Sequence, residues 1–118
     1  MLKGIDISKW QDGINLEAIE TDFVICKATE GVGYTDKTCD RYYQKAKSLG
    51  KKLGVYHFAR PDLGNSAIAE ADYFIKETLG YHKEAMLILD FEPQGHLHNV
   101  TWAKQWLDRV YEKTGIKP

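Results

Sequence analysis

The stretch Ala85-Met-Leu-Ile-Leu-Asp-Phe-Glu92 is an apolar run that ends in two acidic residues. We predict that it forms a strand, because turn residues follow it and a helical pattern comes next. Side chains alternate along a strand, so Asp90 and Glu92 share one face, with their Cβ atoms about 6.6 Å apart. The stretch therefore predicts a strand whose carboxyl end presents two carboxylates side by side.

The same order, a strand pattern followed by a helix pattern, occurs four times along the chain. Such a recurrence is typical of βα units and a parallel sheet, so the predicted fold class is α/β. Asn15 is the expected N-cap of the first helix, and Gly50 and Gly80 are expected to end the second and third helices. The expected strands are 2–8, 23–29, 52–59 and 85–92, and the expected helices are 15–20, 37–49, 65–79 and 100–114.

The last four residues, Gly115-Ile-Lys-Pro118, have the pattern that leads from a helix into another strand. A closed βα barrel typically needs about 250 residues, so four units in 118 residues can form only an open part of one. We therefore expect residues 1–118 to be a single domain that is incomplete at its C-terminus. Because the outer strands of an open sheet leave backbone groups unpaired, we also expect a homo-oligomer or association with a complementing chain.

Composition limits the possible partners. The chain has 16 Lys and Arg against 17 Asp and Glu, a net charge of −1, and 43% hydrophobic residues. It has no basic stripe or tail, so we expect no nucleic-acid partner. It also has no apolar run long enough to span a membrane, so we expect no membrane insertion. The first residues lack a charged-then-apolar leader, which predicts cytoplasmic synthesis without a signal peptide. Two cysteines are too few for a disulfide framework, and Cys26 is expected to be a buried, reduced thiol.

A third acid, Asp6, is expected at the same end of the sheet as Asp90 and Glu92. Three acids in one place repel one another, so at least one carboxyl pKa should lie well above its usual value, as a general acid requires. A lone Asp-x-Glu is otherwise more often an ordinary strand end or a helix cap, and this alternative stays open.

Other polar and aromatic residues surround these acids in the predicted sheet. Lys27 interrupts an apolar strand, and we expect it either to pair with one of the three acids or to reach an exposed strand edge. Tyr56 and Phe58 share a face that could stack on sugar rings, although core packing is an equal alternative for Phe58. His57 points to the opposite face and is expected to be a packed or capped histidine.

A competing constellation places Asp90 and Glu92 before His96 and His98, which together could ligate a divalent metal. No cysteine or further histidine joins them at ligand spacing, so we expect no metal site.

Four motifs in this order resemble the glycoside hydrolase family 25 lysozymes, which are N-acetylmuramidases, many of them phage endolysins or bacterial autolysins. The resemblance implies a flattened (β/α) TIM-like barrel, here without its C-terminal strands. It also implies cleavage of the β-1,4 bond between N-acetylmuramic acid and N-acetylglucosamine in bacterial peptidoglycan, at the cell wall after release, with no metal or organic cofactor. The motifs are Gly4-Ile-Asp-Ile-Ser-Lys-Trp-Gln11, Lys27-Ala-Thr-Glu-Gly31, Gly54-Val-Tyr-His-Phe-Ala59 and Leu89-Asp-Phe-Glu-Pro93.

The resemblance also assigns roles to residues. Glu92 is similar to the family's general acid, and Asp90 and Asp6 resemble acids that stabilise the transition state or orient the substrate's acetamido group. Lys27, Glu30 and Tyr56 occupy matching positions along the groove.

The family's later strands, which supply part of the groove and a further aspartate, have no counterpart up to Pro118. A catalytically silent wall-binding or assembly module and a metal-dependent polysaccharide hydrolase therefore remain alternatives. Whether Trp10 packs under the barrel or stacks on sugar is also left open.

Overall fold

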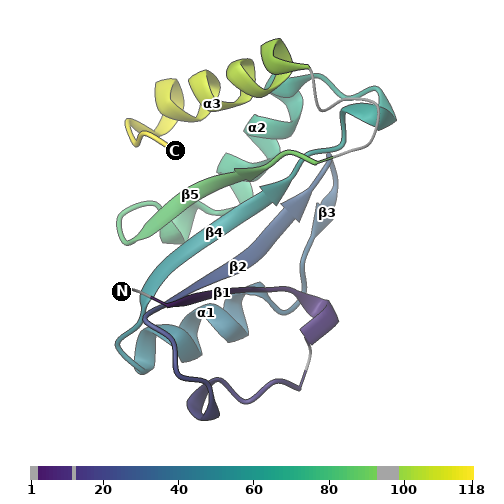
Figure 1. Ribbon diagram of the computed structural model, residues 1–118. Coiled ribbons are helices and arrows are strands. Elements are labelled where there is room, and N and C mark those ends of the chain that lie inside the picture. The colour runs from purple at the N-terminus through teal and green to yellow at the C-terminus, as the bar shows by residue number, and fades with distance from the viewer. Residues whose placement is uncertain (1–2, 12, 93–98) are drawn as a thin grey trace.

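The structure is a computed structural model that describes residues 3–11, 13–92 and 99–118. Its centre is one sheet in which four strands run parallel in the order β1-β2-β4-β5 (Figure 1). These strands are β1 (Gly4–Ile7), β2 (Phe23–Glu30), β4 (Lys52–Phe58) and β5 (Ala85–Asp90). The predicted α/β class, the parallel sheet and the positions of its four strands are confirmed. The sheet does not close into a barrel over the described residues.

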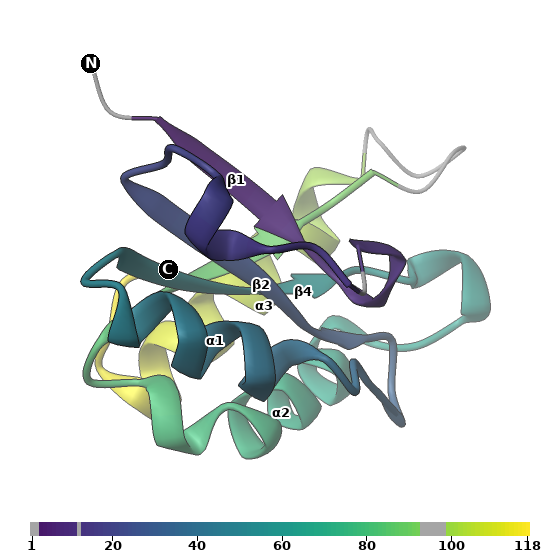
Figure 2. The same cartoon turned by 90° about the horizontal axis from the view of Figure 1, so that it is seen from below.

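The helices lie together on one side of the sheet, as Figure 2 shows from below. Helices α1 and α2 pack against the central strands, and α3 packs against α2. The connecting segments contain the short 3₁₀ helices η1 (Lys9–Gln11), η2 (Leu16–Ala18), η3 (Pro61–Leu63) and η4 (Leu79–Tyr81). The three α-helices are α1 (Cys39–Ser48), α2 (Ala67–Glu77) and α3 (Val100–Thr114).

Several predicted details need correction. The first helix is only the single turn η2, although Asn15 does cap it by accepting a hydrogen bond from the backbone of Glu17 at 3.1 Å. The third helix ends at Glu77, before Gly80, because the chain tightens into η4. A two-residue strand, β3 (Tyr34–Thr35), pairs antiparallel with the end of β2 and was not predicted. A pairing this short leaves no alternation in the sequence to detect.

The hydrophobic core lies between the sheet and the helices. Trp106 and Phe74 are fully buried, and their ring centroids lie 5.1 Å apart. Cys26 and Cys39 are buried free thiols, which confirms the expectation for Cys26. The residues Ala67, Ala71 and Phe74 are buried in this core, and Ile75 packs against it.

The opposite face of the sheet, here called the open face, is not covered by any described helix (Figure 2). Alternation places Ile25, Tyr56, Ile88 and Asp90 on it. Met86 lies on the same face and is 55% exposed. The open face therefore leaves the carboxyl ends of the parallel strands accessible, where βα folds place their chemistry.

Among the described residues, no helix combines the length and apolar character needed to cross a bilayer.

Candidate active site

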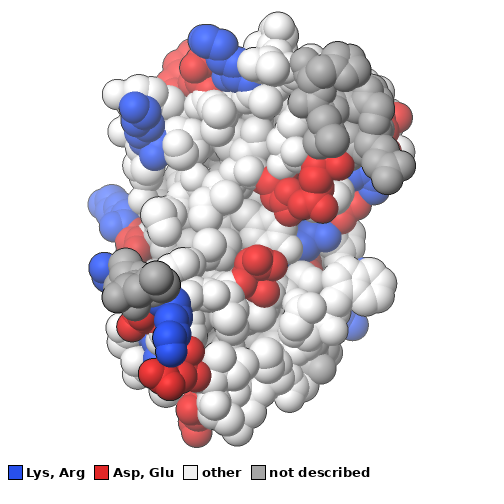
Figure 3. Space-filling model, viewed as in Figure 1, with Lys and Arg blue, Asp and Glu red and all other residues white. Residues whose placement is uncertain are grey.

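A hollow of about 350 Å³ opens at the carboxyl ends of β1, β4 and β5. Asp6, Tyr56, Asp90 and Glu92 line it. Figure 3 shows the acidic side chains gathered on this face of the molecule. The structure thus brings all three predicted acids to one place, although β5 ends at Asp90 and Glu92 follows just beyond the strand.

The floor of the hollow depends on a glycine. Gly54 lies in β4, where it pairs with Ile25 of β2 on one side and with Met86 of β5 on the other. A Cβ atom at Gly54 would lie only 3.2 Å from Ile25 Cγ1 and 3.3 Å from Ile88 Cδ1. The missing side chain therefore lets two apolar side chains approach each other from neighbouring strands and leaves room above them for a ligand.

The pKa of Asp90 is raised in this hollow. Burial raises its pKa to about 7, and a hydrogen bond with Glu92 and the charges of Glu92 and Asp6 act in the same direction. Lys27 opposes the shift. Because Asp90 and Glu92 share a hydrogen bond, the pair holds a proton close to neutral pH. This agrees with the expectation that three neighbouring acids raise at least one carboxyl pKa.

Tyr56 is the aromatic residue of the hollow. Burial and the nearby charges of Asp6, Asp90, Asp36 and Glu92 raise the pKa of its hydroxyl far above the usual range. The phenol therefore stays protonated at any physiological pH and can donate a hydrogen bond into the hollow.

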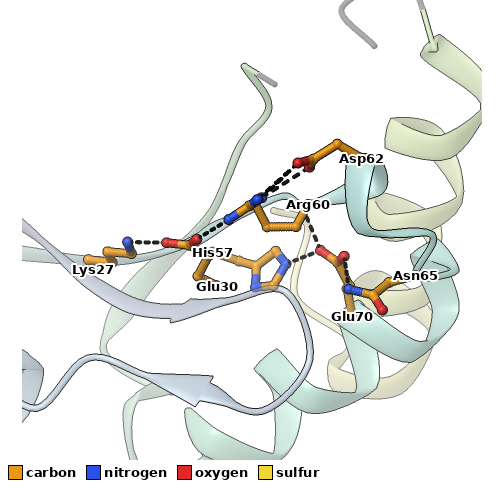
Figure 4. A network of polar contacts seen from close by, with 7 residues as sticks. All are labelled: Lys27, Glu30, His57, Arg60, Asp62, Asn65 and Glu70. Carbon is orange, nitrogen blue, oxygen red and sulfur yellow. Dashed lines mark hydrogen bonds and ion pairs between the residues drawn. The ribbon is translucent and has the colours of Figure 1, made fainter. Parts of the chain in front are cut away.

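Lys27 lies beside the hollow but does not pair with its acids, and it does not reach a strand edge. Both of its predicted environments are wrong, because its Nζ donates to Glu30 Oε1 at 2.6 Å while the residue is only 7% exposed. Arg60 Nη1 donates to the other oxygen of Glu30 at 2.7 Å (Figure 4). Burial raises the pKa of Glu30, but the hydrogen bonds from these two cations outweigh it and lower the pKa.

Phe58 is half-buried on the open face, where the Nζ of Lys27 lies 5.3 Å from its ring centroid. It belongs neither to the buried core cluster nor to the lining of the hollow. Glu30 likewise lies outside that lining. Both residues contact Lys27, which lies beside the hollow.

His57 and Glu70 form a buried pair on the helix side of the sheet (Figure 4). His57 Nε2 lies 2.8 Å from Glu70 Oε1, and His57 Nδ1 lies 2.7 Å from Thr29 Oγ1. Burial lowers the pKa of His57 against the opposing effect of Glu70. The neutral ring therefore donates to Glu70 and accepts from Thr29, which confirms a packed rather than a catalytic histidine.

Glu70 is the residue that sequence reasoning missed. It is fully buried, and it also accepts hydrogen bonds from the backbone N–H of Arg60 at 3.0 Å and from Asn65 Nδ2 at 3.0 Å. It thereby fixes the loop that carries the Arg60 guanidinium toward Glu30. The signal was present, since Glu70 falls on the same helical stripe as Ala67, Ala71 and Phe74.

Two of the residues proposed for a metal site, His96 and His98, lie outside the described residues. Within residues 3–11, 13–92 and 99–118, no group of three or more His, Cys, Asp or Glu side chains is placed to hold a metal ion. The described polar side chains that line the hollow are three carboxyl groups and a phenol.

Carboxylates grouped at the carboxyl ends of parallel strands define a class of α/β proteins to which many glycosidases belong. The chain belongs to glycosyl hydrolases family 25, whose model matches residues 5–118.

Relatives and solved structures agree with this assignment. The chain is 32% identical to Lysozyme M1 of Streptomyces globisporus over 95% of its length, and 33% identical to an N,O-diacetylmuramidase of Chalaropsis over 99%. It superposes on a family GH25 lysozyme from Aspergillus fumigatus with a TM-score of 0.86 at 30% identity over 99% of the chain. It spans only 42%, 64% and 63% of these three proteins, respectively.

Proposed function

We propose that the chain carries the acidic side of a lysozyme active site. The reaction is hydrolysis of the β-1,4 bond between N-acetylmuramic acid and N-acetylglucosamine in bacterial peptidoglycan. The observation that carries this proposal is the hydrogen-bonded pair of Asp90 and Glu92, which faces Asp6 across one hollow and holds a proton near neutral pH. The names of the relatives, lysozyme and N,O-diacetylmuramidase, support it.

Glu92 is the proposed general acid. It is more exposed than Asp90, so a glycosidic oxygen entering the hollow meets its carboxyl group first. The proton of the pair passes through Glu92 to that oxygen as the glycosidic C–O bond breaks. The elements of water then complete the hydrolysis: hydroxide adds to the sugar carbon, and a proton returns to the carboxyl pair.

The remaining side chains support this step. The negative charges of Asp90 and Asp6 stabilise the positive charge that develops on the sugar ring. Tyr56 donates a hydrogen bond to the bound sugar, and Phe58 with Lys27 forms the adjoining wall. Glu30 keeps Lys27 in place without lining the hollow.

We further propose that the sheet is one part of a flattened β/α barrel and that residues 1–118 belong to a single catalytic domain. The apolar side chains Ile25, Met86 and Ile88 on the open face support this proposal, since a sheet face of this composition is normally covered. A second copy or a complementing chain is the proposed cover for the 118-residue chain. A single monomeric species in sedimentation at micromolar concentration would contradict that association.

The activity is tested by measuring reducing ends released from purified peptidoglycan by this chain and by Glu92→Gln. We expect the substitution to lower the rate by about 10²- to 10⁴-fold, the usual contribution of a general acid. Glu20→Gln is the matched control, because the Glu20 side chain is 91% exposed and does not line the hollow. Its rate should stay within about twofold of wild type, as for most surface substitutions.

Two results would replace the proposal by its alternatives. Peptidoglycan that is pulled down by the chain without release of soluble fragments would indicate a silent wall-binding module. Hydrolysis that survives Glu92→Gln but stops with a chelator would indicate a metal-dependent hydrolase.

A further inference from the structure

A row of alternating aromatic rings and ammonium groups extends away from the hollow. The Nζ of Lys27 lies 5.3 Å from the ring centroids of both Phe58 and Tyr34. The Nζ of Lys9 lies 5.1 Å from the centroid of Tyr34 and 5.0 Å from that of Trp10. Trp10 is thus joined to the wall of the hollow by continuous cation–π contacts.

The two lysines of this row differ in their charge balance. Lys27 is buried and neutralised by Glu30 at 2.6 Å. Lys9 is half-exposed, and among the described residues no carboxylate lies within ion-pair distance of its Nζ. Trp10 beside it is 78% exposed. A single exposed tryptophan is unremarkable, but the ammonium of Lys9, held between two rings and without a carboxylate partner in the described part of the chain, can attract an anionic group.

The short helix η1 that carries these two side chains has a firmly held backbone. The N–H of Lys9 donates to Asp36 Oδ2 at 3.0 Å, and Asp36 is only 3% exposed. The other oxygen of Asp36 accepts from the N–H and hydroxyl of Thr38 at 2.9 and 2.6 Å. The N–H of Trp10 donates to Ser8 Oγ at 3.3 Å. Exposed side chains on a fixed backbone lose little further backbone freedom when they bind.

We propose that Lys9, Trp10 and Tyr34 form a ledge that binds the anionic peptide stem of peptidoglycan. A carboxylate of the stem pairs with Lys9 Nζ, and the aliphatic part of the stem lies on the indole of Trp10. The inference rests on the proposed function and adds a substrate contact outside the hollow.

Charge favours this occupant over a neutral sugar. The hollow contains Asp6, Asp90 and Glu92, which repel any carboxylate on the substrate. A glycan bound in the hollow therefore places its charged branches away from these acids. The ammonium of Lys9 lies farther along the row of rings and ammonium groups, where it attracts them.

The test uses a soluble disaccharide peptide, N-acetylglucosaminyl-N-acetylmuramyl pentapeptide, with free or amidated carboxylates. Binding is measured by calorimetry to the 118-residue Glu92→Gln chain, so that the ligand stays intact. Quenching by acrylamide reports on Trp10, because Trp102 and Trp106 are only 7% and 0% exposed. We expect the charged ligand to protect Trp10 from the quencher.

A charge cycle identifies the contact. Lys9→Gln should weaken binding of the charged ligand by about two- to fivefold, the range of an exposed ion pair. It should leave binding of the amidated ligand unchanged. Lys52→Gln, which removes an exposed lysine at the opposite end of β4, should affect neither ligand. Circular dichroism of each variant checks that it folds.

Two outcomes would overturn the proposal. Equal weakening of both ligands by Lys9→Gln would show that no stem carboxylate meets Lys9. Equal affinity and equal protection of Trp10 by a neutral chitotetraose would show a sugar platform instead of a peptide ledge. Failure of the proposed function is separate, since it appears as absent release of reducing ends by the wild-type chain whatever the result of the charge cycle.

Discussion

Carboxylates at the carboxyl ends of different strands of the same sheet differ in their surroundings. In the hollow, Asp90 shares a hydrogen bond with another acid, and its pKa is raised. Beside the hollow, Glu30 is held by Lys27 and Arg60, and its pKa is lowered. Phe58 of β4 pairs with Glu30 on one side and with Asp90 on the other, so a single strand separates the two environments.

The difference shows how one sheet edge serves two purposes. Where cations meet a carboxylate, the carboxylate stays charged and fixes structure. Where burial and neighbouring acids outweigh the nearest cation, a proton is retained and becomes available for transfer. Glu30 binds Lys27 and Arg60, the cations that could otherwise neutralise the acids of the hollow. Glu30 therefore helps indirectly to keep the pKa of Asp90 raised.

The largest effect should come from removing a charge in the hollow. Asp90→Asn keeps the size of the side chain but cannot stabilise positive charge on the sugar, so hydrolysis should fall by about 10²- to 10³-fold. Reducing-end release measures this loss. The comparison between the two groups predicts a much smaller loss for Asp62→Asn, whose carboxylate contacts the far side of Arg60. Equal losses in the two variants would remove the distinction.

The free energy of unfolding should change most when Glu70, a fully buried acid, is replaced. Glu70→Ala leaves the donors of His57, Arg60 and Asn65 without their acceptor in a buried place, so the free energy of unfolding should fall by about 3 kcal/mol. Urea unfolding followed by circular dichroism measures it. Lys76→Ala, at an exposed position of the same helix, should change stability by less than about 0.5 kcal/mol. A loss for Glu70→Ala as small as this control would contradict the clamp assigned to Glu70.

The two groups should also change stability with pH in opposite directions. The pKa of Asp90 is about 7 in the folded chain against an ordinary 3.8, so the folded state binds more protons between these values. Stability should therefore fall as pH rises from about 4 to 7. Because the hollow is open to solvent, we expect a fall on the order of 1 kcal/mol. Asp90→Asn should abolish it.

Glu30 should behave in the reverse way. Its folded pKa is lowered, so its contribution is present above the ordinary value of 4.5 and is lost as pH falls through the folded value. Urea midpoints from pH 3 to 8 for wild type, Asp90→Asn and Glu30→Gln test both signs. An Asp90→Asn curve parallel to wild type between pH 4 and 7 would contradict the raised pKa.

The smallest effect should come from Arg60, one of the two cations that hold Glu30. The Arg60 side chain is 29% exposed, so Arg60→Gln should cost about 0.5–1 kcal/mol and raise the pKa of Glu30. Urea unfolding and carboxyl NMR titration measure the two changes. Arg109→Gln is the matched control, because Arg109 is 24% exposed and pairs with Asp72 on α2. It should give a similar stability loss without changing the titration of Glu30.

Much of the fold could be predicted because its strands and helices have clear periodicities. Phe23–Glu30 and Val100–Thr114 were predicted within one residue of their observed bounds. The exceptions are short elements. η2 and β3 contain three and two residues, so neither offers a repeat to detect, and tertiary contacts decide their form.

The candidate site was predictable to the extent that alternation along strands determines it. Asp6, Tyr56 and Asp90 face the hollow as their positions on parallel strands require. The partner of Lys27 was not predictable from alternation, because Glu30 lies at the strand end, where the β3 hairpin and Arg60 determine its direction. Pairing across loops depends on contacts that no local pattern encodes.

The buried thiols give this chain a built-in reporter of its own opening. Cys26 lies on β2 and Cys39 begins α1, and both are buried between sheet and helix. Burial raises the pKa of both thiols, that of Cys39 to about 12, so they are unreactive while the helix is docked. A thiol reagent will label only molecules in which α1 has separated from β2. Labelling kinetics therefore follow that local opening directly, with no substrate and no dye.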